Sequence, residues 1–388
     1  MATGYKILQL QSSVGFYGAE NMLMQLSCAL RGSDFTPVIG VISNAAMPNL
    51  ELARIAGRHR LAAEVFPCRS VLDWRTIKQL RAYLRRENIA VVQTHGYKSD
   101  TFAVLASSFL PVVRLATCHP WIINSRRGQL YAAIDKRVLT RFDHLVAVSD
   151  SVRADLTRTK LPSEKISLIP NGIDIQPFQR RFDRRRLRQE YQLPMSACII
   201  GCVGRLDPEK GQDLLIEACA KLDKKLDWIL LLAGTGSCEV QLQRQAERLG
   251  IADRVRFLGF TDTIPQFLAA LDLLVLPSRT EGTPLALLEA MAARCAIMAA
   301  AVGQVPQIIT HLQTGYLIRP GCTEEMEEGI RYLIENPQHG RQMGMQAAEL
   351  VSREFSASKM AEAYMQIYSG LITSMRPAPA GQRKPPAR

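Results

Sequence analysis

Short runs of apolar residues, rich in β-branched side chains, alternate with segments of helical pattern along this chain. In the first half these runs are YKILQLQ (5–11), PVIGVIS (37–43), IAVVQTH (89–95), VVRLATCH (112–119), HLVAVSD (144–150) and ISLIPNGID (166–174). A buried strand, a polar or glycine-containing turn and then a helix is the pattern of parallel βαβ units. The sequence therefore predicts an α/β fold with a doubly wound parallel sheet.

The alternation stops over residues 175–196, an arginine-rich segment flanked by prolines, and then starts again. The second series is CIIGCVGRL (198–206), WILLLAGTG (228–236), VRFLGF (255–260), DLLVLPS (272–278) and AIMAAA (296–301). Helical pattern returns over 323–336 and 341–373. We interpret 175–196 as a linker, with room for a short helix, between two successive doubly wound domains.

A chain of 388 residues also exceeds what one hydrophobic core usually supports. The sequence thus predicts two Rossmann-like domains, 1–180 and 181–373, followed by a disordered basic tail, 374–388. The last helices are left free to pack back on the first domain. Ligands of such sheets bind beyond the carboxyl ends of the strands, so we expect a site in a cleft between facing domains.

Composition and charge narrow the class of protein. Nine cysteines without a C-x-x-C pair argue against a disulfide framework and a zinc module. No secretory signal and no apolar run of about 18 residues are present, so we expect a cytoplasmic protein that is soluble or peripheral. The net charge of +12 lies mostly in residues 1–180, which hold 23 Lys and Arg against 13 Asp and Glu.

Part of this charge falls on the segment 72–88. One helical face carries the basic residues Arg75, Lys78, Arg81, Arg85 and Arg86, and another carries Leu72, Ile77, Leu80 and Leu84. The basic face is either a solvated surface or an attachment point for anionic lipids or an acidic acceptor. Nucleic acid is not expected as a partner, because exposed aromatic residues are not interleaved with these cations.

Two acids, Glu281 and Glu289, lie in the apolar stretch SRTEGTPLALLEAMA. Thr283 suits an N-cap and Pro284 a first helical position, so a helix should begin at about residue 284. It is apolar on nearly every face, as in a helix buried against a sheet. Glu281 would precede this helix and Glu289 would project from its second turn. Either the two acids are a solvated residue and an ion-paired one, or they bind a ligand.

Further candidate residues also follow predicted strands. Arg205 and Lys210, in GRLDPEKG, suit a diphosphate, although two solvated loop cations fit equally well. The GTGS turn with Gly234 lacks the third glycine of a dinucleotide fingerprint. Gly18 allows close approach of a phosphate or sugar, or simply a tight turn. His95 and His119 stand at strand ends, where a histidine is either structural or catalytic.

The ordered set GAE, TCHP, VAVSDSV, IPNGID, GRLDPEKGQDLLIEA, LLAGTGS, RFLGF and DLLVLPSRTEGTPLALLEAMA resembles the retaining, nucleotide-sugar-dependent glycosyltransferases of family 4 (glycosyltransferase group 1). The resemblance extends to about residue 320 and implies the GT-B fold. It also implies an enzyme that transfers a sugar from a nucleoside-diphosphate sugar to a glycan or lipid-linked acceptor, in polysaccharide or glycolipid synthesis.

The resemblance assigns roles to individual residues. Glu281 would contact hydroxyls of the donor sugar, and Glu289 would bind the ribose. Arg205 and Lys210 would neutralise the diphosphate, and His119 would touch the sugar near the reacting carbon. The remaining donor-binding residues would be Gly18, Gly234, Gly282, Thr283, Pro284 and Leu285. On the acceptor or membrane side we place the basic residues of 72–88 together with His95.

The resemblance also bears on mechanism. Fixed cations stabilise the charge that grows on a departing diphosphate. With Arg205 and Lys210 in that role and no Asp-x-Asp in the chain, we expect neither a metal nor another cofactor. Retention would follow from front-face attack, with a phosphate oxygen as base. The chain departs from the family at Ala19, where a glycine is usual, and at Gln304 and Gln307, the second replacing an acid.

Three alternatives remain open at this stage. A glycoside hydrolase would use Glu281 and Glu289 as an acid and base about 5–9.5 Å apart. A GT-B epimerase would act on the sugar nucleotide itself. A non-catalytic protein would bind nucleotides, lipid or nucleic acid without transfer. The donor base and sugar, the linkage and the oligomeric state do not follow from the sequence.

Overall fold

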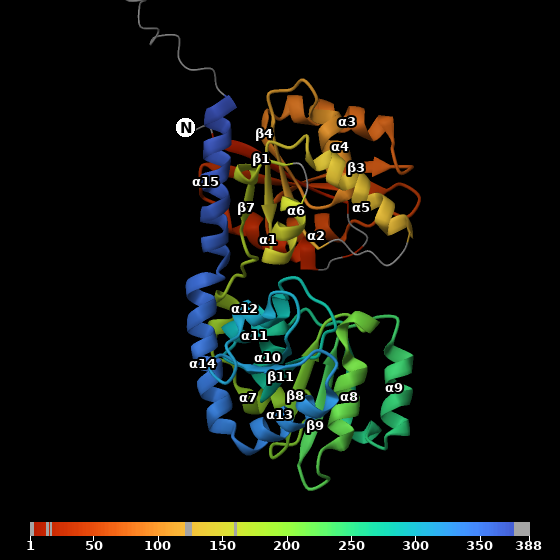
Figure 1. The fold of residues 1–388 in the computed structure, drawn as a ribbon, viewed down its shortest axis with the longest axis vertical. Helices are drawn as coiled ribbons and strands as arrows, with labels where there is room; N and C mark the ends of the chain where they lie inside the picture. Colours follow the sequence, from red (N-terminus) through yellow and green to blue (C-terminus); the bar gives the residue numbers. More distant parts are fainter. Residues whose placement is uncertain (1–3, 13–14, 16–17, 121–125, 159–160, 376–388) are drawn as a thin grey trace, which may run out of the picture. The chain divides into compact units, whose positions relative to one another are not determined.

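The computed structural model of the protein describes residues 4–12, 15, 18–120, 126–158 and 161–375. Contacts divide the chain into two compact units. Unit 1 contains the residues up to Pro170 and those from Ala357 onward, and unit 2 contains Asn171–Ser356. The tail predicted over 374–388 lies outside the described residues from position 376. Figure 1 shows the course of the chain.

Unit 1 is built on a parallel sheet with the strand order β3-β2-β1-β4-β5-β6-β7. Its strands are β1 (Tyr5–Gln11), β2 (Phe35–Asn44), β3 (Ala62–Cys68), β4 (Ile89–Thr94), β5 (Val113–Cys118), β6 (His144–Ala147) and β7 (Ile166–Leu168). The middle strands are buried on both faces, which explains why their sequences read as nearly continuous apolar runs. The order reverses between β1 and β4.

Helices cover the sheet of unit 1, and the last helix of the chain is one of them. They are α1 (Gly18–Ala29), α2 (Glu51–Arg58), α3 (Trp74–Arg86), α4 (Tyr97–Ser107), α5 (Arg126–Leu139), α6 (Asp150–Thr157) and α15 (Ala357–Met375), with a short 3₁₀ turn at Ser163–Lys165. The helix α15 packs beside α1 on the middle strands (Figure 1). Its Met360, Tyr364 and Tyr368 share a buried cluster with Ile7 of β1 and Val91 of β4. The carboxyl-terminal segment is thus part of the core of unit 1.

Unit 2 repeats this architecture with a parallel sheet of order β10-β9-β8-β11-β12-β13. Its strands are β8 (Cys198–Val203), β9 (Trp228–Ala233), β10 (Val255–Gly259), β11 (Leu273–Leu276), β12 (Ala296–Ala300) and β13 (Tyr316–Ile318). Its helices are α7 (Arg184–Glu190), α8 (Gln212–Lys221), α9 (Glu239–Arg248), α10 (Ile264–Ala270), α11 (Leu285–Ala292), α12 (Val305–Ile308), α13 (Thr323–Glu335) and α14 (Pro337–Glu354), with 3₁₀ turns at Gln176–Gln179, Pro208–Lys210 and Ala252–Arg254. The predicted fold class, two Rossmann-like parallel α/β units, is confirmed.

Two local features differ from the sequence predictions, and a third, the short helix for which the linker left room, is present. The edge strands β3 and β13 were not predicted, because β3 is mostly exposed or half-buried and β13 is only three residues long. The predicted linker contains the helix α7, whose Arg188 is buried and pairs with Asp272 at 2.5 Å. The helix predicted over 341–373 is interrupted near Phe355, whose carbonyl accepts a hydrogen bond from the backbone of Ile173 at 3.0 Å.

Two further observations concern membrane-spanning helices and the state of the cysteines. Within the described residues, no helix combines the length and the apolar character needed to cross a membrane. All nine cysteines are free thiols in the structure, and five of them are buried. Burial raises the pKa of the Cys202 thiol to about 12, so this side chain is neutral and packs as a small apolar residue.

The helix α14 packs closely against the chain that enters β12, and this packing leads to a prediction about the effect of a glycine substitution on stability. A Cβ on Gly344 would lie 2.4 Å from the carbonyl oxygen of Arg294. We expect Gly344→Ala to lower the free energy of unfolding of unit 2 by about 1–3 kcal/mol, because backbone atoms would have to move. The matched control is Gly370→Ala in α15, where a Cβ would meet nothing within 4 Å. It should leave stability unchanged or raise it by up to about 1 kcal/mol. Urea unfolding followed by circular dichroism measures both, and equal stabilities for the two variants would contradict the packing argument.

Candidate functional site

In unit 2, the candidate residues gather on the loops that follow β8 and β11. These strands are neighbours at the point where the strand order reverses, the position at which ligands of such sheets bind beyond the carboxyl ends of the strands. The β8 loop carries Arg205 and Lys210, and the β11 loop carries Ser278 and Glu281. The structure therefore brings together four side chains from two loops that lie far apart in the sequence.

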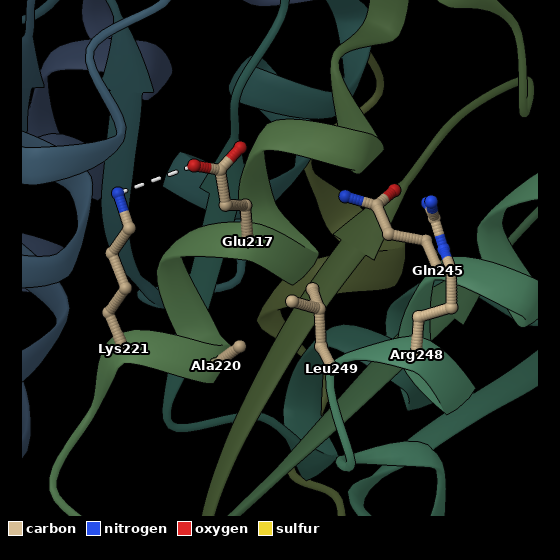
Figure 2. Close-up of a pocket in the computed structure, with 6 residues that line it drawn as sticks. All are labelled: Glu217, Ala220, Lys221, Gln245, Arg248 and Leu249. Atoms are coloured by element: carbon tan, nitrogen blue, oxygen red, sulfur yellow. Dashed lines mark ion pairs between the residues drawn. The ribbon is translucent and has the colours of Figure 1, made fainter.

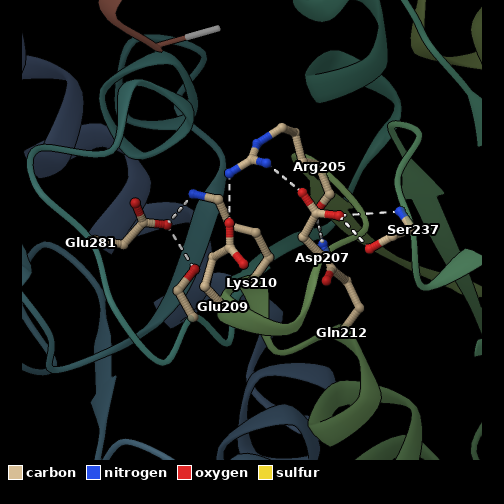
Figure 3. Close-up of polar contacts among 8 residues, drawn as sticks. Arg205, Asp207, Glu209, Lys210, Gln212, Ser237 and Glu281 are labelled. Atoms are coloured by element: carbon tan, nitrogen blue, oxygen red, sulfur yellow. Dashed lines mark hydrogen bonds and ion pairs between the residues drawn. The ribbon is translucent and has the colours of Figure 1, made fainter. Parts of the chain in front are cut away.

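The two loops are joined by an ion pair between Lys210 and Glu281. The Lys210 Nζ lies 2.6 Å from Glu281 Oε1 (Figure 3). The same oxygen accepts a hydrogen bond from the Ser278 hydroxyl at 2.7 Å. Only 9% of the Glu281 side chain is exposed, against 25% of the Lys210 side chain. The alternative that Glu281 is a solvated loop residue is therefore wrong.

Arg205 is enclosed by acids of its own loop. Its guanidinium pairs with Asp207, and its Nη2 lies 2.5 Å from Glu209 Oε1 (Figure 3). Burial alone would raise the pKa of Asp207, but the amide and hydroxyl of Ser237 and the charge of Arg205 together lower it. Arg205 is thus an ion-paired loop cation whose side chain is 40% exposed. An anion that binds Arg205 has to exchange with these carboxylates.

Gly234, in the turn after β9, has a steric role. Its φ is 143°, and a Cβ there would lie 1.9 Å from the carbonyl oxygen of Gly204. Glycine is therefore required for the β9 loop to pack on the start of the β8 loop. Ser237, three residues later, donates its backbone N–H to Asp207 at 3.1 Å, so this turn also helps to hold the loop of Arg205.

The helix after the β11 loop begins one residue later than predicted. Pro284 has an extended conformation and occupies the N-cap position, and the helix α11 starts at Leu285. Thr283 is not the N-cap: its hydroxyl donates to the Gln304 side chain at 3.1 Å. The backbone N–H of Gln304 also donates to the Gly282 carbonyl at 3.1 Å. Gln304, which departs from the family pattern, therefore holds the segment just before the helix.

Glu289 lies on the second turn of α11, as predicted, and is partly exposed. The neighbouring Leu287, Leu288 and Ala290 are fully buried, so the helix is fixed in the core of unit 2 and Glu289 emerges from it. The two acids of the motif thus have different settings. Glu281 is held by a cation on a loop, whereas Glu289 belongs to a rigid helix.

In unit 1, His95 and His119 directly follow β4 and β5 and lie close together. Their ring centroids are 6.1 Å apart. Burial lowers the pKa of His119 to about 4, with a smaller opposing effect of the Glu20 carboxylate. Burial, and to a lesser extent His119, also holds the pKa of His95 well below its usual value. Both rings are therefore neutral at pH 7.

Around these rings, further polar groups come from β1 and α1. The Gln9 side chain contacts His95 Nε2 through its oxygen at 2.8 Å, and Gln11 donates to Glu20 at 3.0 Å. Gly18 is the first residue of α1 and is exposed, and a Cβ there would meet no described atom within 4 Å. The polar residues Gln9, Gln11 and Glu20 were not predicted as site residues. For Gln9 and Gln11 the signal is polar side chains at alternate positions of β1, whereas Glu20 lies on α1.

The basic face predicted on segment 72–88 is divided in the structure. Arg75, Lys78 and Arg85 of α3 are exposed. The prediction that Arg81 belongs to the basic face is wrong. Its guanidinium donates to the carbonyls of Ala106 at 3.1 Å and Ser108 at 2.6 Å, and so holds α3 to α4. Arg86 pairs with Glu87 at 3.0 Å. The apolar face also differs from the prediction: Leu72 is exposed, and Tyr83 joins Ile77, Leu80 and Leu84 in the core.

A surface pocket of about 450 Å³ lies elsewhere in unit 2 (Figure 2). It is formed by the last turns of α8 and α9, where the chain returns toward the amino ends of the strands. Lys221 pairs there with Glu217 at 3.3 Å. None of the candidate site residues lines this pocket, so we place the functional site at the strand ends instead.

Both halves of the chain match known protein families. Residues 16–177 match the family described as Glycosyltransferase Family 4, and residues 183–350 match the family Glycosyl transferases group 1. The alpha-D-kanosaminyltransferase of Streptomyces kanamyceticus is 30% identical over 306 residues, which are 74% of this chain and 79% of that protein.

Two other proteins extend the comparison. The N-acetyl-alpha-D-glucosaminyl L-malate synthase of Bacillus anthracis is 32% identical over 230 residues, 59% of this chain, and the match spans 60% of that relative's length. The structure of Anabaena Alr3699/HepE in complex with UDP-glucose superposes with a TM-score of 0.83 at 23% identity, covering 94% of this chain and 99% of that one. This likeness confirms the GT-B fold. The chain therefore belongs to the glycosyltransferases, with a Family 4 region over residues 16–177 and a group 1 region over residues 183–350.

Proposed function

We propose that the protein is a retaining, metal-independent glycosyltransferase that moves a sugar from a nucleoside-diphosphate sugar to a glycan or lipid-linked acceptor. The observation that carries the proposal is the contact between Lys210 and Glu281 beside Arg205, at the strand-order reversal of unit 2. One loop supplies cations for a leaving diphosphate, and the other supplies an acid for sugar hydroxyls. Donor complexes of the HepE structure, with UDP and with UDP-glucose, support a donor of this class.

In this proposal the cations of unit 2 do the electrostatic work of the reaction. Breaking the anomeric C–O bond leaves negative charge on the diphosphate, and a cation fixed before the reaction stabilises that charge without reorganising. Lys210 is held in place by Glu281 and is partly buried, which strengthens its field. Arg205 reaches the phosphate by exchanging Glu209 or Asp207 for phosphate oxygens.

The remaining roles follow the family resemblance. Glu281 would bind donor-sugar hydroxyls through its second carboxylate oxygen, Glu289 would bind the ribose, and His119 would contact the sugar near the reacting carbon. For His119 the low pKa suits this role, because a neutral ring can exchange hydrogen bonds with hydroxyl groups without attracting the phosphate. Attack would occur on the face that the diphosphate leaves, with a phosphate oxygen as base.

The geometry favours a glycosyltransferase over a glycoside hydrolase. An acid catalyst has to hold a proton on its carboxyl group and give it to the leaving oxygen. Glu281 instead accepts from both the ammonium of Lys210 and the hydroxyl of Ser278 through one oxygen. That arrangement suits a carboxylate that receives hydrogen bonds, as sugar recognition requires.

A screen of UDP-, GDP- and ADP-sugars tests the donor proposal. We expect one nucleotide class to raise the thermal unfolding temperature, because a ligand of the folded state stabilises it by about 2.7 kcal/mol at a hundredfold excess over its Kd. With that donor and an acceptor, transfer should proceed in EDTA, and the anomeric proton coupling of the product should match that of the donor by NMR. Absence of any stabilisation would contradict donor binding, and an inverted product would contradict retention.

Lys210→Ala tests the leaving-group role. We expect kcat to fall by roughly 10²–10³, the loss seen when one fixed group that stabilises transition-state charge is removed. Circular dichroism and the unfolding temperature check that the fold survives, since Glu281 loses its cation. The matched control is Lys221→Ala, which removes a lysine ion-paired with Glu324 and Glu217 at the opposite ends of the strands. Near-normal turnover by Lys210→Ala would remove the role that we assign to this residue.

For the acceptor, we propose that the amino-terminal end of α3 contacts an anionic membrane surface. Val71, Leu72 and Trp74 are exposed there by 72%, 43% and 60%. Arg75 and Lys78, also exposed, lie on the same stretch. Apolar side chains that insert at the headgroup level, next to cations that attract anionic lipids, are the features of an interfacial anchor. This surface would bring the enzyme to a lipid-linked acceptor.

Vesicle sedimentation tests this surface. The wild-type protein should bind vesicles containing anionic lipid, bind zwitterionic vesicles more weakly, and be released by salt. The double variant Val71→Ser/Trp74→Ser should lose most of this binding. The control Val240→Ser/Leu249→Ser removes two exposed apolar residues of unit 2 and should bind as wild type does. Equal binding by both double variants would contradict the assignment of the surface to α3.

A further inference from the structure

A row of polar side chains crosses the middle of the sheet of unit 1. Gln9 of β1, Gln93 of β4 and Thr117 of β5 are at most 2% exposed. Gln9 and Gln93 are register partners on adjacent parallel strands. Amides and hydroxyls buried at such depth reduce stability unless each donor and acceptor is paired. Their presence in an otherwise apolar layer indicates a role other than packing.

The partners of this row come from the last helix. The hydroxyl of Tyr368 donates to Gln93 Oε1 and lies 3.4 Å from Gln9 Nε2. One turn earlier, the Tyr364 hydroxyl lies 3.1 Å from Thr117 Oγ1. Both tyrosines are fully buried. The helix α15, which follows unit 2 in the chain, thus enters the polar centre of unit 1.

The row sets the direction of the hydrogen bond to His95. Gln9 Nε2 donates to Gln93 Oε1 at 3.2 Å and faces the Tyr368 oxygen, which uses its own proton toward Gln93. The Gln9 oxygen is therefore the atom left for His95 Nε2, at 2.8 Å. Because that oxygen only accepts, Nε2 of His95 has to carry the ring proton. Nδ1 is then an unprotonated acceptor.

His95 Nδ1 and His119 Nε2 are both buried and have no hydrogen-bond partner within the part of the chain that the structure describes. The two rings are neighbours at the carboxyl edge of the sheet. An unsatisfied buried acceptor lowers stability, so its retention beside a candidate catalytic residue points to a ligand that supplies the missing donor. Hydroxyl groups, which a sugar or glycan carries in number, are the simplest such donors.

We propose that Tyr368 is a positioning residue: through Gln93 and Gln9 it holds His95 in the Nε2–H tautomer, so that Nδ1 accepts a hydrogen bond from a substrate hydroxyl. This inference rests on the proposed function for the identity of the substrate. The tautomer itself depends only on contacts within unit 1. Tyr368 touches no substrate and acts through the amide of Gln9.

The test is the tautomer of His95, measured by NMR on protein labelled with ¹⁵N-histidine at pH 7.5. The signal of His95 is assigned as the histidine signal that is missing from the spectrum of the His95→Gln variant. We expect the wild-type protein to show Nε2–H. In Tyr368→Phe, the proton that orients the two glutamine amides is lost, so both tautomers should be populated. With the donor found by screening, kcat should fall several-fold, while the stabilisation of the protein by donor stays unchanged.

The matched control is Tyr364→Phe, which removes an equally buried hydroxyl from the same helix but leaves the contacts of Gln9 intact. It should retain the wild-type tautomer and more of the activity. Equal loss of activity in the two variants, with the tautomer unchanged in both, would assign Tyr368 a structural role and overturn the proposal. An Nδ1–H tautomer in the wild type would overturn it too. Because the tautomer needs no substrate, failure of the proposed function appears separately, as absence of transfer by the wild-type protein.

Discussion

Parallel strands can be joined only by crossovers, and this constraint determines where function can lie in each unit. Every strand of the two sheets runs in the same direction as its neighbours, so every chain segment that leaves a strand does so at one edge. Where the strand order reverses, between β1 and β4 and between β8 and β11, the departing segments diverge, and ligands of such sheets bind there. Three candidate residues lie on the segments that leave these strands: His95 directly after β4, Arg205 soon after β8 and Glu281 on the loop that follows β11.

The same constraint explains which parts of the fold the sequence predicts well. A strand buried on both faces tends to be apolar almost throughout, so β9 is evident from its residues alone. An edge strand has fewer neighbours, and β3 with its exposed Pro67 carries no such pattern. Burial of the surrounding element, more than local propensity, therefore decides whether the sequence shows it.

The candidate site is predicted only in part from the sequence, and the reason differs from that for the strands. Motif residues such as Arg205, Lys210 and Glu281 can be found because their spacing within a loop is local. The partners of Arg205, Asp207 and Glu209, are local too, but Lys210 meets Glu281 only after β8 and β11 become neighbours. Arg81 belonged by its spacing to a basic face, but its guanidinium caps carbonyls at the end of α4. A hydrogen bond to a distant backbone oxygen leaves no trace in the sequence.

The two units hold their functional groups in opposite electrostatic states. Unit 2 presents full charges, and each is compensated by an oppositely charged side chain nearby, since an isolated partly buried charge would be too unfavourable. Unit 1 presents two imidazoles that burial keeps neutral, so their chemistry is that of hydrogen bonding. A neutral imidazole has one donor and one acceptor nitrogen, and only its surroundings decide which is which. A charged site needs counter-charges, whereas a neutral site needs a fixed tautomer. That difference accounts for a rigid row of amides and tyrosines at the centre of one sheet and for exchangeable ion pairs at the edge of the other.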